Sequence, residues 1–306
     1  MIIKTMDSKQ DEIEELSSWL NEKITPSQRF QIERELKAIR NGVLGEEDAA
    51  YYIDFYFGES KNWAVIHDLR IEYEDQVAQI DHILMNRMFD IYVLESKNYS
   101  YKITFTPEGE SKVYSGTQYY GVPSPIEQNK RHIHLLERFL KAKEILPKRM
   151  GIPISPRLKS LILISPKSII SRPSEKKFDT SMVIKADTLR TKIDDEVEKS
   201  GPAATFASIS KVSSSSTLKE VARRLVRYHW PHKIDWRGRF GLPSEGPSGY
   251  RNVPVQKKGG QGIKDSSKYF CFKCKKDISE KVAKFCFQNS PKFGGKAYCF
   301  DCQKSF

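Results

Sequence analysis

No stretch of the 306-residue chain holds the roughly 18 consecutive apolar residues that a membrane-spanning helix needs. The first residues, MIIKTMDSKQDEIEEL, turn acidic after six positions and lack the apolar core of a secretion signal. We therefore expect a soluble, cytoplasmic protein without a membrane partner. The sequence does not decide whether the chain forms a homo-oligomer.

Cysteine is also scarce, since the chain has only five, too few for a disulfide scaffold of this length. Four of them form two C-x-x-C pairs, Cys271/Cys274 and Cys299/Cys302, with 24 residues between the pairs. This spacing predicts a Cys₄ zinc site that supplies the folding energy of a small module. The alternative is a redox dithiol, which would need only one pair. Cys286 is the odd thiol and could replace one ligand, although the symmetry of the pairs favours the other four.

Net charge is nearly absent from the first 230 residues, which hold 35 basic and 33 acidic side chains. Residues 231–306 hold 16 basic and 6 acidic ones, so +10 of the total +12 lies in the last quarter. A concentrated basic segment attracts polyanions such as nucleic acid, although many basic tails only improve solubility.

Periodicity and turn residues predict the order of the elements. Helices are expected over 11–23, 27–42, 43–57, 125–145 and 216–229, with Gly42 as a C-cap, and strands near 63–71, 77–85, 90–97, 101–105, 157–165 and 181–186. Helices that flank a central sheet define an α/β or α+β fold. We expect a helical extension (1–41), a core domain (42–232), a flexible basic linker (233–268) and a zinc module (269–306).

Three charged residues interrupt two apolar strands: Asp81 in the first, Glu95 and Lys97 in the second. Side chains alternate between the faces of a strand, so Glu95 and Lys97 share a face. If the strands form a hairpin with a loop at 87–89, Asp81 lies opposite Glu95. A two-residue loop would shift the pairing by one residue, so the register depends on the length of the loop and stays open.

In the favourable register, two carboxylates face each other and repel unless a cation lies between them. Mg²⁺ and Mn²⁺ prefer carboxylate oxygen, and Lys97 beside them could orient or activate a water, or hold a phosphate oxygen. This set suits metal-assisted phosphodiester hydrolysis. Taken alone, the pattern also fits an ordinary Glu–Lys pair on an exposed strand.

Several short motifs, in order, resemble the nuclease-related domain (NERD) family, which is similar to the PD-(D/E)xK restriction-endonuclease-like superfamily. They are GEE at 45–47, QIDHIL at 79–84, VLESKNY at 93–99 and SPIEQNKRHIHLLERFL at 124–140. The resemblance covers roughly residues 40–230. It implies a mixed sheet flanked by helices and active-site roles for Glu46, Asp81, Glu95, Lys97 and Gln128, with the three acids on Mg²⁺ or Mn²⁺.

Two of these residues also have ordinary explanations. Glu46 lies on the apolar face of its helix, where it could reach a metal, but a Glu in a first turn also favours the helix dipole. Gln128 shares a helical stripe with His132 and could reach a phosphate or hold Lys97, or it could be a surface amide. His82 points to the strand face opposite Asp81, so we expect a core or second-layer role for it rather than catalysis.

The segment KFCFQNSPKFGGKAYCFDCQ resembles the zinc ribbons of bacterial topoisomerase I type and those appended to some NERD proteins. The resemblance implies contact with single-stranded or duplex DNA. Aromatic and basic residues in the module suit base stacking over a basic groove, or else the aromatics form its small core. The candidate nucleic-acid contacts are Phe272, Lys273, Phe293, Lys296 and Tyr298.

Two classes of function therefore compete. The first is a Mg²⁺- or Mn²⁺-dependent deoxyribonuclease whose zinc ribbon holds the substrate, with RNA as an alternative substrate. The second is a non-catalytic adaptor that binds nucleic acid or protein on a nuclease-like fold. Intact acidic and lysine positions favour the enzyme.

Overall fold

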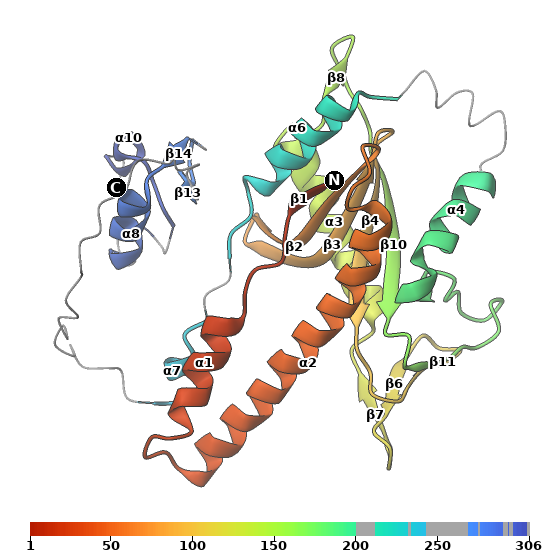
Figure 1. Ribbon diagram of the computed structural model, residues 1–306, viewed down its shortest axis with the longest axis vertical. Coiled ribbons are helices and arrows are strands. Elements are labelled where there is room, and N and C mark those ends of the chain that lie inside the picture. The colour runs from red at the N-terminus through yellow and green to blue at the C-terminus, as the bar shows by residue number, and fades with distance from the viewer. Residues whose placement is uncertain are drawn as a thin grey trace. The chain divides into compact units, whose positions relative to one another are not determined.

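The computed structural model describes residues 1–199, 212–231, 234–242, 269–274, 276–289, 293 and 296–304 (Figure 1). The chain divides into two compact units, Met1–Leu242 and Pro243–Phe306. None of the helices within these described residues is both long and apolar enough to cross a membrane.

A six-stranded mixed sheet forms the centre of the first unit, in the order β1-β2-β3-β4-β10-β12. Strands β2, β3 and β4 pair antiparallel, and β1, β10 and β12 join them in parallel. The strands are β1 (Ile2–Lys4), β2 (Trp63–Tyr73), β3 (Gln76–Asn86), β4 (Asp90–Lys97), β10 (Arg157–Ile164) and β12 (Val183–Lys185). The expected mixed α/β fold with helices flanking mixed sheets is confirmed.

Helices cover both faces of this sheet (Figure 1). On one face, α3 (Pro125–Ala142) and α6 (Ser215–Val226) pack against apolar side chains of β2, β3 and β4. On the other face, α2 (Pro26–Phe57), η1 (Ala186–Thr188) and α4 (Leu189–Lys199) pack against β2, β3, β4 and β10. Glu95 and its neighbours on β4 are therefore enclosed on both sides of the sheet.

A second sheet of four short strands has the order β11-β5-β6-β7. It contains β5 (Lys102–Phe105), β6 (Ser111–Tyr114), β7 (Tyr119–Val122) and β11 (Ile169–Ser171). Its inner face packs on β10, β12 and the start of α3 through a separate apolar cluster. A small hairpin pairs β8 (Lys148–Arg149) with β9 (Ile152–Pro153).

The predicted helix break at Gly42 is wrong, because α2 is one helix of 32 residues. Thr25 and Gln28 form a capping box at its start, and Pro26 occupies the first turn. A glycine inside a helix costs about 1 kcal/mol relative to alanine. Packing outweighs this cost, because the first half of α2 contacts α1 (Gln10–Trp19) and the second half contacts the sheet.

Residues 234–242, expected to begin a flexible linker, instead pack on the helical extension. They form the short helix α7 (Trp236–Arg239), and Trp236, Phe240 and Leu242 join the apolar cluster of α1 and α2. The Trp236 Nε1–H donates to Glu12 Oε1 at 2.7 Å. The remainder of the predicted linker, 243–268, lies outside the described residues.

The described residues of the second unit form a two-stranded sheet and two helices. Its described elements are β13 (Tyr269–Phe270), β14 (Asp277–Ile278), α8 (Glu280–Gln288) and α10 (Phe300–Gln303). The fully buried side chains include Cys271, Ala283, Cys286 and Ala297. Such a small core agrees with a module that needs a metal for stability.

Candidate functional site

The loop of the β3–β4 hairpin sets the register of the site. It consists of Arg87, Met88 and Phe89, and Phe89 has a positive φ of 59°. The Asn86 side chain holds the loop, because its Oδ1 accepts from the backbone N–H groups of Met88 and Asp90 at 2.9 and 3.0 Å. The paired residues run from Met85 with Ile91 to His82 with Leu94. Continuing this register places Asp81 opposite Glu95 on one face of the sheet.

The regular backbone pairing between β3 and β4 ends at His82. At the next position, the side-chain carboxylate of Asp81 contacts β4. Its Oδ2 accepts from the backbone N–H and from the hydroxyl of Ser96, both at 2.8 Å. The carboxylate therefore lies against β4, beside the neighbours of Ser96. Opposite Asp81 on β2, Asp68 has a positive φ of 52° and interrupts the pairing there.

Glu95 is the most enclosed acid of the set, with 1 % of its surface exposed. Its Oε1 lies 2.5 Å from Lys97 Nζ. Its Oε2 lies 3.3 Å from His132 Nδ1, yet the two atoms lack hydrogen-bond geometry, and both are buried without a partner. A buried carboxylate oxygen without a partner is costly, which makes Oε2 a candidate ligand atom for a cation.

Helix α3 brings His132 to this position. One turn earlier, Asn129 is fully buried, and its Nδ2 donates to the Val93 carbonyl at 2.8 Å and to the Ser160 hydroxyl at 2.9 Å. These bonds fix α3 on β4 and β10. Gln128 is half-buried on the same helix, and among the described residues no hydrogen bond joins its side chain to Lys97. This role of Asn129 could not be predicted from the sequence, because no local pattern distinguishes a buried amide from a surface amide.

Helix α2 brings Glu46 to the site through a close approach at Gly45. A Cβ at Gly45 would lie 2.7 Å from the Asn98 Cβ, closer than real side chains come. The absence of a side chain at Gly45 therefore lets α2 contact the end of β4. Glu46, the next residue, is half-buried and close enough to Asp81, Asp68 and Glu95 for their charges to act on it.

The electrostatics of the site show a cluster of acids with too little positive charge. Burial, then repulsion by Asp81 and Asp68, raises the pKa of Glu46 to about 8. Burial and the charge of Glu95 raise the pKa of Asp81 to about 7. Burial alone would lower the pKa of Lys97, but Glu95 and Asp81 outweigh it and raise that pKa. Lys97 is therefore a stable ammonium at neutral pH.

The donor set fits a hard divalent cation, since it offers carboxylate oxygens, one of them buried without a partner. The carboxylates do not form a closed cage in this structure. Within the described part of the chain, the only group of three or more ligand atoms mutually within 4.8 Å is that of the four paired cysteines.

His82 lies away from the acids, in a buried chain of polar side chains. It is fully buried, and its Nδ1 lies 2.8 Å from His67 Nδ1. His67 Nε2 in turn lies 3.0 Å from Asp54 Oδ1 on α2. Burial, and then the neighbouring His67, holds the pKa of His82 well below its usual value. This position agrees with the core location expected for His82.

The second unit gathers Cys271, Cys274, Cys299 and Cys302 into one group. Zn–S bonds of about 2.3 Å in a tetrahedron place sulfurs roughly 3.8 Å apart. The Cys274 and Cys299 sulfurs are 3.6 Å apart, which fits this geometry. Burial would raise the pKa of the Cys271 thiol, but hydrogen bonds from Cys274 and Cys299 hold it at about 6. The group is a potential metal site, consistent with a zinc ribbon.

Cys286 does not belong to this group. It is buried in α8, where its Sγ accepts from the Tyr298 N–H and from Gln303 Nε2, both at 3.2 Å. Phe293 and Tyr298 are 2 % and 6 % exposed, so these two rings are core residues of the module and are not free to stack on bases.

Phe272 and the module's lysines lie nearer the surface. Phe272 is half-buried, and Lys296 Nζ lies 4.2 Å from the centre of its ring. Lys273 is exposed. A nucleic-acid contact for these three side chains stays a prediction.

Comparison with known proteins gives one family. No curated protein and no solved structure matches the chain. One family model, described as "Nuclease-related domain" (NERD), matches residues 41–165, a shorter range than the expected 42–232, and these residues include Glu46, Asp81, Glu95, Lys97 and Gln128. Residues 41–165 are thus similar to the nuclease-related domain family, within a chain that also carries a four-cysteine group consistent with a zinc ribbon.

Proposed function

We propose that the protein is a metal-dependent nuclease that hydrolyses DNA phosphodiester bonds. One observation carries this proposal. The buried Glu95 has one oxygen on Lys97 and the other without a partner, and it lies in register with Asp81. An ordinary surface Glu–Lys pair would have an exposed carboxylate that water satisfies.

In this proposal, Asp81 and Glu95 hold Mg²⁺ or Mn²⁺, and Glu46 adds a third carboxylate. The cation, when bound, lowers the pKa of water and neutralises the charge that develops on the phosphate. Ser96 orients Asp81 through its N–H and hydroxyl. Gln128 stays a proposed contact to a phosphate, and His132 is well placed to orient Glu95.

Lys97 serves as a donor to a phosphate oxygen in this scheme. Its raised pKa keeps the ammonium protonated at neutral pH, so it is a poor acceptor for a proton from water. A charged donor beside the reacting phosphate stabilises the transition state more than the ground state. We therefore do not assign Lys97 as the residue that accepts the proton of the attacking water.

We also infer that the zinc ribbon holds the nucleic acid. The excess of +10 in residues 231–306 and the surface lysines of the module support this role. The metal of the ribbon is structural, because four thiolates leave no open position for a substrate.

Binding of Mn²⁺ to the full-length, zinc-loaded protein tests the proposed cation site. Glu95→Gln should weaken Mn²⁺ binding by at least about tenfold. Glu127→Gln is the matched control, because Glu127 is an exposed acid paired with Lys130. Equal Mn²⁺ affinity in both variants would rule out the proposed cation site and favour a non-catalytic adaptor.

A further inference from the structure

The outer face of the second sheet carries a ladder of tyrosines. Tyr101 and Tyr114 have ring centres 6.2 Å apart, and Tyr114 and Tyr119 have ring centres 5.0 Å apart. Tyr101 and Tyr119 are each about half exposed, at 52 % and 50 %. Tyrosines gathered in this way on an open sheet offer flat apolar surfaces to a ligand.

Lysines lie among these rings. The pairing of β5, β6 and β7 places Lys102, Tyr114 and Tyr119 in one row across the strands. Lys112 lies in the next row, between Thr104 and Gly121, and its Nζ is 5.8 Å from the centre of the Tyr119 ring. The strand face therefore combines aromatic rings with two cations, which is complementary to a phosphate backbone.

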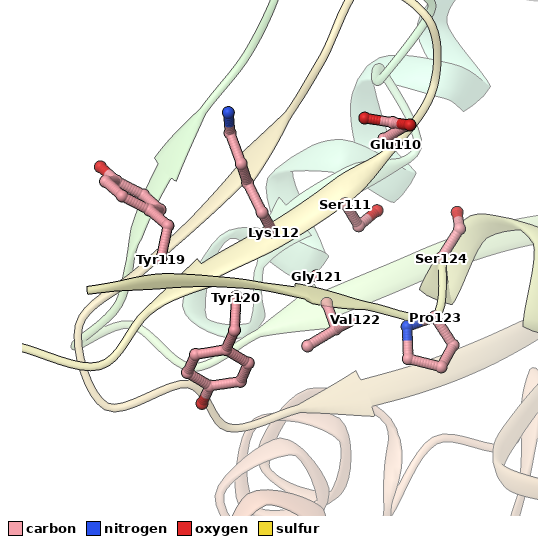
Figure 2. Close-up of a pocket in the computed structure, with 9 residues that line it drawn as sticks. All are labelled: Glu110, Ser111, Lys112, Tyr119, Tyr120, Gly121, Val122, Pro123 and Ser124. Carbon is pink, nitrogen blue, oxygen red and sulfur yellow. The ribbon is translucent and has the colours of Figure 1, made fainter.

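Gly121 leaves open space on this face, because a Cβ there would meet no atom within 4 Å. A hollow at the β6–β7 pair is lined by residues 110–112 and 119–124, which belong to both faces and include the acid Glu110. Figure 2 shows Lys112 and Tyr119 projecting from one face of the β6–β7 pair and the Tyr120 ring projecting from the other. Gly121 therefore leaves open space on the face that carries Lys112 and Tyr119.

The sheet is connected directly to the acidic site. Burial raises the pKa of Tyr99, and Lys97, Glu95 and Tyr120 are close enough to act on that pKa as well. After β7, the chain passes through Pro123 and Ser124 into α3, the helix that carries His132. The second sheet therefore joins the acidic site through its inner face and through α3, whereas Tyr114, Tyr119 and Lys112 lie on its outer face.

We propose that this face binds single-stranded nucleic acid, by stacking of unpaired bases on Tyr119 and Tyr114 and by contacts of Lys102 and Lys112 to phosphates. The inference deepens the proposed nuclease function and names its substrate as a single strand or a single-stranded end. Unpaired bases expose both ring faces, whereas a duplex hides them in its own stack. A duplex would be held on this face through its phosphates alone, without the contribution of base stacking.

The test measures binding of full-length protein to fluorescent oligothymidylate, oligouridylate and a DNA duplex in chelator, so that no cleavage occurs. Tyr119→Ala should weaken single-strand binding about fivefold or more, the cost of one lost stack. Duplex affinity should not change. Gly121→Val should have the same effect, because it puts a branched side chain on the face that carries Tyr119, at a position where a Cβ meets no atom within 4 Å.

Two controls separate stacking from structure. Tyr119→Phe keeps the ring and should bind like the wild type. Tyr51→Ala removes another exposed tyrosine, 65 % exposed on α2, and should also bind like the wild type. Single-strand affinity unchanged in Tyr119→Ala and Gly121→Val would overturn the proposal, as would a loss in Tyr119→Phe as large as in Tyr119→Ala. A greater loss with oligouridylate than with oligothymidylate would support the proposal and assign RNA as the ligand. Because these measurements need no cleavage, they can fail while the proposed nuclease reaction stands, or succeed while it fails.

Discussion

At the scale of single residues, the acids of the candidate site are held in an unfavourable state that a cation would relieve. Burial, Asp81 and Asp68 raise the pKa of Glu46 to about 8, and burial and Glu95 raise that of Asp81 to about 7. Carboxyl groups in an unfolded chain have pKa values of about 4. Between these values the folded protein binds more protons than the unfolded chain.

The stability of the metal-free protein should therefore fall as the pH rises. The stabilisation from these two carboxyl groups is fully present below pH ~4 and is lost as the pH rises through about 7 for Asp81 and about 8 for Glu46. Glu46→Gln should flatten this decline, and Mg²⁺ should reverse it at pH ~8.5, where the acids are ionised. Thermal unfolding between pH ~5 and ~9, with and without chelator, measures the effect.

The neighbouring acid offers a control for this prediction. Glu47 is exposed on the same turn of α2, so Glu47→Gln should leave the pH profile of the wild type unchanged. Parallel profiles for wild type and Glu46→Gln would show that Glu46 has an ordinary pKa and is not part of a coupled acidic site.

At the scale of elements, the contact between α2 and the end of β4 positions Glu46. Gly45→Ala should reduce cleavage by about 100-fold, because displacement of a catalytic group by about 1 Å can cost that much. The same change at Gly42 meets no atom within 4 Å and should stabilise the helix by about 0.5–1 kcal/mol without affecting cleavage. Single-turnover rates and unfolding free energies of both variants test this difference.

Equal activity of Gly45→Ala and Gly42→Ala would mean that a shift of α2 does not slow cleavage. The position of Glu46 would then not matter for catalysis. The pair is well matched, because both substitutions lie in the interior of the same helix.

The elements also show how far the sequence alone reaches. Local patterns were enough to predict the strands at Asp81 and Glu95, since apolar alternation is a property of each strand. The register could not be predicted, because it depends on the length of the loop. The hydrogen bonds of Asn86 to Met88 and Asp90 hold a three-residue loop, and apolar alternation does not report them. The continuity of α2 through Gly42 depends on packing against α1 and the sheet, which no local pattern reports.

At the scale of the whole molecule, the excess positive charge and the proposed catalytic residues lie in different parts of the chain. The proposed catalytic residues lie in Met1–Leu242, and most of the net positive charge lies beyond residue 230. The four-cysteine group belongs to the second unit. Holding the substrate and cutting it should therefore be separable by mutation.

Replacing Cys271 and Cys274 by Ser should remove zinc and unfold the ribbon. DNA binding should weaken, and the slope of log affinity against log salt should flatten by roughly 0.9 for each lost phosphate contact. Cys286→Ser should retain one zinc, because Cys286 lies outside the group of four. Zinc content and binding at several salt concentrations give the result. If the salt dependence of DNA binding did not change when zinc was lost, the ribbon would instead be assigned to binding a protein partner.

The central claim is that Asp81, Glu95 and Lys97 cut phosphodiester bonds with a divalent cation. The most direct measurement is cleavage of linear, nicked, supercoiled and single-stranded DNA, and of RNA, by wild type, Glu95→Gln, Lys97→Ala and the control Lys130→Ala, in Mg²⁺, Mn²⁺ or chelator. We predict cleavage by wild type and Lys130→Ala only with a cation, and a loss of at least about 1,000-fold in Glu95→Gln and Lys97→Ala. Absence of cleavage by the wild type on every substrate with both cations, or undiminished cleavage by Glu95→Gln, would contradict the account.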